Sequence, residues 1–97
     1  MLYAVLFEDN AEKAAERPRL MPEHQAFLRK NADRIRNAGP LIETNGSAAG
    51  GLWVVDAANG NEVQELVEQD PLWPTGLRKS VRVLEWKRVF NSSKSFL

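Results

Sequence analysis

The chain has no cysteine, a single histidine and no net charge, and each of these absences excludes a class of protein. Without cysteine, neither a disulfide framework nor a thiolate metal site is available. One histidine among scattered acidic residues does not make a transition-metal site, so we expect no metal. The 13 lysine and arginine residues are balanced by 13 aspartate and glutamate residues, which argues against nucleic acid as a partner.

Long hydrophobic runs are also missing. No run approaches the roughly 18 apolar residues that a membrane-spanning helix needs, so no membrane partner is expected. The apolar stretch 1–7 lacks a basic leader and meets Glu8 and Asp9 at once, so it does not resemble a signal peptide and we expect a cytoplasmic protein. A chain of 97 residues, 43% of them hydrophobic, makes one small domain whose limited core favours association with a second copy.

Hydrophobic periodicity predicts six main elements in the order β-α-β-β-α-β. The predicted strands cover residues 2–8, 41–44, 52–55 and 81–88. The first helix begins at Pro22, which suits a first helical turn, and is expected to end at Gly39-Pro40. The second helix follows a cap at residues 59–61 and ends at Pro71. The polar stretch 9–19 is expected to be a loop with one helical turn.

This order predicts an α+β fold, the ferredoxin-like βαββαβ plait, with antiparallel strands and both helices on one face. The other face is expected to receive large apolar groups from Trp53 and the last strand, and a second copy packed against it would cover them. We therefore predict a homodimer that associates sheet to sheet. The single domain is expected to span residues 1–90. The Ser-rich tail 91–97 is either disordered or an arm that docks on a partner.

His24 and Asp70 are the candidate catalytic residues. In the predicted topology the two helices run antiparallel, so the start of the first, with His24, lies beside the end of the second, with Asp70. Each residue also falls on the apolar stripe of its own helix and should point inward. A carboxylate that accepts a hydrogen bond from one imidazole nitrogen leaves the other nitrogen free to act as a base near neutral pH.

Three further residues are candidates for the same site, each with a purely structural alternative. Arg17 could hold an anionic or phenolate oxygen, because a guanidinium presents a fixed fork of donors, or it could be a solvated loop arginine. Trp73 could wall an aromatic substrate or plug the core. Asp9, just past the first strand, could supply a second carboxylate.

The order and spacing of several short motifs resemble the YciI-like (YCII-related) family over residues 1–90. The motifs are Arg17-x4-Pro22-x-His24, Ala38-Gly39-Pro40, Asp70-Pro71, Ser80-Val81 and Trp86-Lys87-Arg88-Val89-Phe90. The resemblance implies a dimeric α+β barrel in which two plaits pack sheet to sheet. It also implies an active site built on a His–Asp dyad, which maps onto His24 and Asp70.

Two functions remain open at this stage. In the first, the protein is an enzyme that needs no cofactor, in which His24 transfers a proton during elimination or isomerisation of a small cyclic or aromatic substrate. In the second, it is a non-catalytic dimeric module for ligand binding or an accessory role, and the His24–Asp70 pair is structural. Replacement of His24 separates the two, because a structural histidine affects stability and a catalytic one affects turnover.

Overall fold

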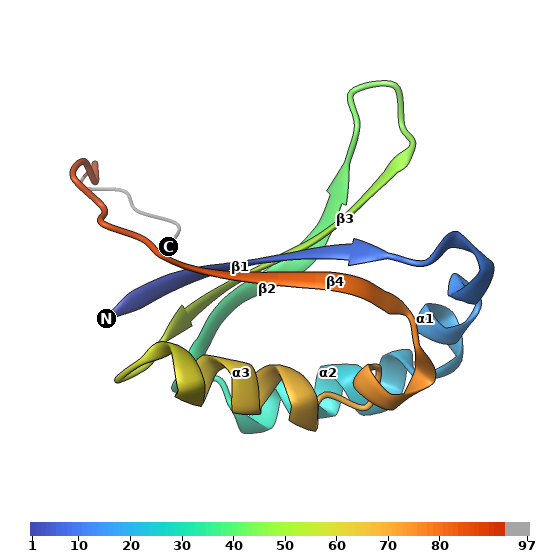
Figure 1. Cartoon of the computed structure of the whole chain (residues 1–97), viewed down its shortest axis with the longest axis horizontal. Coiled ribbons are helices and arrows are strands. Elements are labelled where there is room, and N and C mark those ends of the chain that lie inside the picture. The colour runs from blue at the N-terminus through green and yellow to red at the C-terminus, as the bar shows by residue number, and fades with distance from the viewer. Residues whose placement is uncertain (93–97) are drawn as a thin grey trace.

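The computed structural model describes residues 1–92, and the rest of the predicted tail 91–97 lies outside the described residues. Four antiparallel strands form one sheet in the order β2-β3-β1-β4, and Figure 1 shows the helices gathered on one face of it. The strands are β1 (Leu2–Asp9), β2 (Ile35–Ile42), β3 (Ala48–Asp56) and β4 (Arg78–Glu85). The helices are α1 (Glu16–Arg19), α2 (Met21–Lys30) and α3 (Gly60–Gln69), with short 3-10 turns η1 (Ala11–Lys13) and η2 (Trp73–Thr75). This topology matches the predicted ferredoxin-like plait.

The core lies between the sheet and the helices, where alternate residues of the strands meet the apolar stripe of α3. On β1 these residues are Tyr3, Val5 and Phe7, all buried. From α3, Val63 and Leu66 are fully buried. Full burial of such a side chain contributes about 1.5–3 kcal/mol, so this packing fixes the position of α3 on the sheet. The start of α3 is capped as predicted, because the Asn59 side chain accepts a hydrogen bond from the Glu62 backbone N–H at 2.9 Å.

The predicted end of the first helix is wrong by eight residues. Helix α2 ends at Lys30, and the chain turns and enters β2 at Ile35. Asn31 ends the helix by donating its side-chain amide to the Phe27 carbonyl at 2.9 Å. The Gly39-Pro40 pair therefore stops no helix and lies inside β2. Proline is tolerated there because β2 is an edge strand and has no second neighbour for an N–H to pair with.

The stretch 9–19 also contains more helix than predicted, since it holds both η1 and α1. Its first residue, Asp9, still belongs to β1. The remaining residues lead the chain from the end of β1 to the start of α2. They thus place Arg17, from α1, at the end of the sheet where the first turn of α2 begins.

The predicted placement of Trp53 on the open face of the sheet is wrong. Trp53 pairs with Val5 across β1 and β3 and lies on the helix side, with 2% of its surface exposed. Its ring packs against Phe7 at 5.1 Å and Phe27 at 6.1 Å between centroids. All four residues 52–55 are apolar, so their order alone does not show which two face the helices.

The opposite face of the sheet carries apolar side chains from three strands. No helix among residues 1–92 covers it (Figure 1). The strand registers place on this face Leu2, Ala4, Leu6, Leu52, Val54 and Leu84. Leu84 retains 41% exposure, and the residues beyond β4 add two more exposed apolar groups, Val89 and Phe90. We call these six strand residues the open apolar face.

Gly50 is a position where only glycine fits, and its replacement gives a direct test of the β1–β3 pairing. Its φ is +99°, and a Cβ atom added there would lie 1.9 Å from the Phe7 carbonyl oxygen. Gly50→Ala is therefore expected to lower the free energy of unfolding, by about 1–3 kcal/mol from backbone conformation alone and by more if the strands must separate. Urea unfolding measures the loss. Gly60→Ala is the matched control, because no atom lies within 4 Å of its added Cβ and its φ is not positive; an equal loss there would contradict the prediction.

Candidate active site

His24 and Asp70, distant in sequence, form a hydrogen-bonded pair in the interior. The His24 Nδ1 atom lies 2.9 Å from Asp70 Oδ1, and the two side chains are 8% and 3% exposed. Both residues were predicted to point inward and to meet. The structure confirms this proximity.

Local structure at two helix ends produces the pair. His24 lies in the first turns of α2, where its backbone N–H donates to the Leu20 carbonyl. Asp70 follows the last residue of α3 in an extended conformation, at φ −63° and ψ 132°, which stops the helix before Pro71. Its Oδ1 atom also accepts a hydrogen bond from the Leu72 N–H at 3.0 Å. The carboxylate is thus held from two sides and cannot easily turn away from the imidazole.

The pairing sets the tautomer of His24. An ionised carboxylate only accepts hydrogen bonds, so the proton on the imidazole resides on Nδ1, facing Asp70. The other ring nitrogen, Nε2, then carries a free lone pair. A neutral imidazole oriented in this way can take a proton from a bound molecule and return it.

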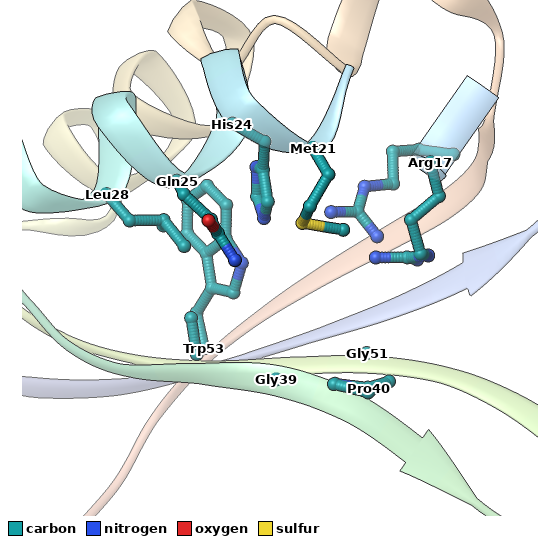
Figure 2. Close-up of a pocket in the computed structure, with 11 residues that line it drawn as sticks. Arg17, Met21, His24, Gln25, Leu28, Gly39, Pro40, Gly51 and Trp53 are labelled. Carbon is teal, nitrogen blue, oxygen red and sulfur yellow. The ribbon is translucent and has the colours of Figure 1, made fainter. Parts of the chain in front are cut away.

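A cavity of about 190 Å³ opens beside His24, between α2 and the strands β2 and β3. Figure 2 shows the His24 ring directed from α2 toward the sheet, with Met21 and Arg17 to one side and Leu28 to the other. The cavity is lined by Arg17, Met21, His24, Gln25, Leu28, Ala38, Gly39, Pro40, Gly51, Trp53 and Arg78. A buried cavity of about 150 Å³ is enough to hold benzene, so this space accepts one small ring with a few substituents.

Two arginines and two carboxylates form a charged cluster at the same site. Asp9 bridges both arginines, since Arg17 donates to its Oδ2 atom and the Arg78 Nη1 donates to its Oδ1 atom at 3.2 Å. Arg78 also faces Asp70, with 3.8 Å between Nη2 and Oδ2, and lies 4.1 Å above the centre of the Phe7 ring. The Asp70 Oδ2 atom is buried and has no hydrogen-bond partner within residues 1–92.

Arg78 is a buried cation, with 4% of its side chain exposed. Burial lowers the pKa of its guanidinium, repulsion from Arg17 lowers that pKa further, and the carboxylates of Asp9 and Asp70 act in the opposite direction. A guanidinium keeps its charge at neutral pH. The site therefore holds a permanent positive charge next to the His24–Asp70 pair.

The structure places the sequence-predicted residues as follows. Arg17 lines the cavity and is paired with Asp9, the candidate second carboxylate, which itself does not line it. Trp73 does not line the cavity and instead packs, half-buried, against the core. Trp53 is the tryptophan at the cavity wall. Sequence reasoning missed both Trp53 and Arg78 as site residues.

A metal centre has no support from the side chains present. Within the described part of the chain, no group of three or more histidine, aspartate or glutamate residues lies close enough to hold a metal ion.

No helix among residues 1–92 is long and apolar enough to cross a membrane.

The fold and the site together define a class: small α+β proteins with a buried histidine–aspartate pair beside a cavity. The model of the YCII-related domain matches residues 1–87, and the chain belongs to this family. The search among curated proteins found no match. A similar solved structure is the 5-chloro-2-hydroxyhydroquinone dehydrochlorinase TftG from Burkholderia phenoliruptrix, in complex with 2,5-dihydroxybenzoquinone. The two chains are 25% identical, with a TM-score of 0.80, and the match covers 91% of this chain and 95% of that one.

Proposed function

We propose that this protein is a small-molecule enzyme that uses His24 as general base and acid and Asp70 as the residue that orients it. The observation that carries the proposal is the buried hydrogen bond between the two, at 2.9 Å, on the wall of a ring-sized cavity. Exclusion of water from such a pair strengthens its electrostatic interactions with a bound molecule. The likeness to a dehydrochlorinase that has a hydroxylated quinone bound supports a small cyclic or aromatic substrate.

The proposed reaction is proton transfer followed by elimination or isomerisation. His24 Nε2 removes a proton beside a carbonyl or from a hydroxyl group. In elimination, the electron pair left behind forms a new double bond and a leaving group such as chloride departs with its own bonding pair. In isomerisation, the proton is returned from His24 to a different atom of the substrate. After elimination, His24 releases the proton it took to water, so both routes balance without an oxidant, a reductant or a cofactor.

The surrounding residues supply binding and positioning. Trp53 and Leu28 offer apolar surface to the ring, and Arg17 can exchange part of its pairing with Asp9 for an oxygen of the substrate. Proton transfer contributes about 10²- to 10⁴-fold of rate, so the rest of the acceleration must come from holding the substrate in place.

Deuterium exchange tests this function across a panel of candidate substrates. The protein is incubated in D2O with 5-chloro-2-hydroxyhydroquinone, other hydroxylated benzenes and small unsaturated lactones. NMR records C–H to C–D exchange, and an ion-selective electrode records released chloride. Protein-dependent exchange or chloride release that requires His24 is the expected result. Binding of these compounds with no exchange and no release would instead favour the non-catalytic module.

We further propose that the protein is a homodimer that packs through the open apolar face. Five of the six side chains on this face are partly or well exposed, Val54 being 2% exposed, and no helix within residues 1–92 covers them. Burial of apolar area is the main favourable term in association. The surface lies opposite the helices, so two copies can pack there without blocking the cavity.

A charge placed on the open apolar face is expected to separate the two copies. Leu84→Glu would put a carboxylate into the proposed interface, where the cost of desolvation opposes association. Light scattering after size exclusion should show a dimer for the original chain and a monomer for Leu84→Glu. Ala26→Glu adds the same charge to the exposed surface of α2 and should remain a dimer. A monomeric original chain would contradict the proposed dimer.

A further inference from the structure

The cavity presents positive charge only, although the chain as a whole is neutral. Its polar lining consists of Arg17, His24, Gln25 and Arg78, and no carboxylate is among the described residues that line it. The two balancing carboxylates, Asp9 and Asp70, contact these groups without lining the cavity: Asp70 is 3% exposed, and Asp9, 23% exposed, lines a neighbouring hollow. The charged groups at the cavity wall are therefore cationic, and their carboxylate partners lie outside its lining.

Arg78 has unused donors at this surface. Its guanidinium has five N–H groups, and only the bond from Nη1 to Asp9 uses one of them within residues 1–92. The contact with Asp70, at 3.8 Å, is too long for a hydrogen bond. The Arg17 guanidinium likewise donates one hydrogen bond within residues 1–92, also to Asp9. Since one carboxylate bridges both guanidiniums, their remaining donors are held at the same end of the cavity.

The two guanidiniums also repel one another, which is the second reason why the pKa of Arg78 is lowered. An anion between them would relieve this repulsion. A neutral carbonyl oxygen could also accept from these donors, but its hydrogen bonds would be weaker and it would not offset the repulsion between the guanidiniums. Asp9 and Asp70 already balance the two guanidinium charges, so the preference for an anionic guest rests on the remaining N–H donors and on the repulsion between Arg17 and Arg78.

We propose that Arg78 is a specificity-determining residue that binds an ionised oxygen of the substrate, so the substrate class is a single-ring compound bearing a carboxylate, phenolate or enolate. This inference rests on the proposed function, from which it takes the position of the substrate site. It adds that the substrate carries a negative charge. The ring occupies the apolar part of the cavity beside Trp53, and the anionic oxygen meets Arg78 and Arg17. His24 then faces the ring rather than the anionic group.

A pair of probes with the same shape tests the proposal. Benzoate and benzamide differ in charge but hardly in size, and both fit the cavity volume. Hydrogen bonds to charged groups contribute about 1.5–3 kcal/mol, so benzoate should bind about 10- to 100-fold more tightly than benzamide. Arg78→Met should remove at least about tenfold of benzoate affinity and leave benzamide affinity within about twofold. Arg29→Met, on the exposed surface of α2, removes the same charge and should leave both affinities unchanged.

A direct measurement avoids dependence on the folding of Arg78→Met. In the original chain, the Nε–H signal of Arg78 is identified by its absence in Arg78→Lys and followed during NMR titration. Benzoate should shift it in a saturable way, and benzamide should not. Equal affinities for the two probes, or a benzoate titration that moves only the Arg17 signal, would overturn the proposal. These measurements record binding and not turnover. The preference for an anion can therefore be disproved without disproving proton transfer by His24, and the reverse also holds.

Discussion

Replacement of His24 by glutamine is expected to lower kcat/KM by about 10²- to 10⁴-fold while the protein stays folded. Glutamine is close to histidine in size, and its amide N–H can still donate to Asp70. It has no nitrogen that can take up a proton, so the general base is lost and the buried hydrogen bond is kept. The rate is measured by deuterium exchange or chloride release on a compound that the original chain turns over, and folding by urea titration.

Glu23→Gln is the matched control for this experiment. Glu23 precedes His24 on α2 but is exposed, and it does not line the cavity. Its activity should equal that of the original chain. The opposite pattern for His24→Gln, in which stability falls and the rate is unchanged, would mean that the histidine is structural and that the proposed enzyme function is wrong.

Asp70→Ala is expected to cause the largest loss of stability, about 3–5 kcal/mol. The substitution removes the acceptor for His24 and for the Leu72 N–H, and it takes away one of the two carboxylates that face the buried Arg78. Buried cations and buried N–H groups without partners are costly, and natural domains are stable by only about 5–15 kcal/mol. Urea unfolding measures the change.

Asp70→Asn distinguishes the effect of the side-chain shape from the effect of its negative charge, because asparagine has nearly the same shape and no charge. Asparagine keeps the carbonyl oxygen that accepts from Leu72 and preserves the packing, so most of the stability should remain. It no longer offers a charged partner to His24 and Arg78, so turnover should fall even where folding does not. If Asp70→Ala and Asp70→Asn lower the free energy of unfolding equally, the charge of Asp70 contributes more to stability than its hydrogen bond to Leu72. If neither variant lowers it, the His24–Asp70 pair does not hold these helix ends together.

The two chain segments that build the pair could be predicted because each has a strong local signal. Pro22 marks the start of one helix, Asn59 caps the other, and Pro71 limits its end. Antiparallel packing on one face of the sheet then brings His24 to Asp70 whatever the details of the loops. The predicted contact is confirmed even though α2 is shorter than expected.

The first part of the edge strand β2 could not be predicted, since its pairing depends on a partner distant in sequence; of the predicted strand 41–44, residues 41 and 42 belong to β2. Residues 31–38 follow a helical pattern of apolar spacing, but Ile35 pairs with Val55 and Ala38 with Trp53 in β3. The ladder of hydrogen bonds to β3 outweighs a modest local preference for helix. Similarly, the choice between Trp53 and Trp73 at the cavity depends on which face of β3 meets the helices, and an unbroken apolar run does not reveal this.

Arg78 was missed for a different reason, namely an irregularity in the register of β4. Strict alternation would place Arg78 on the same side as Ser80 and Arg82, on the open face of the sheet. Glu8 pairs with Ser80 but Asp9 pairs with Arg78, so Lys79 is an extra residue in this strand. Such a bulge redirects the neighbouring side chain, and here Arg78 turns under the helices.

The extra residue at Lys79 has a consequence for how this scaffold diversifies. A strand of the same length without the bulge would put Lys79 opposite Asp9 and would turn Arg78 to the far side of the sheet, with His24 and Asp70 left where they are. In a chain with this fold, gain or loss of that one bulge would therefore move the guanidinium between the two faces of the sheet without any change at the His24–Asp70 pair. The charge beside the cavity and the buried His24–Asp70 pair are thus set by separate parts of the chain, although Arg78 and Asp70 lie only 3.8 Å apart.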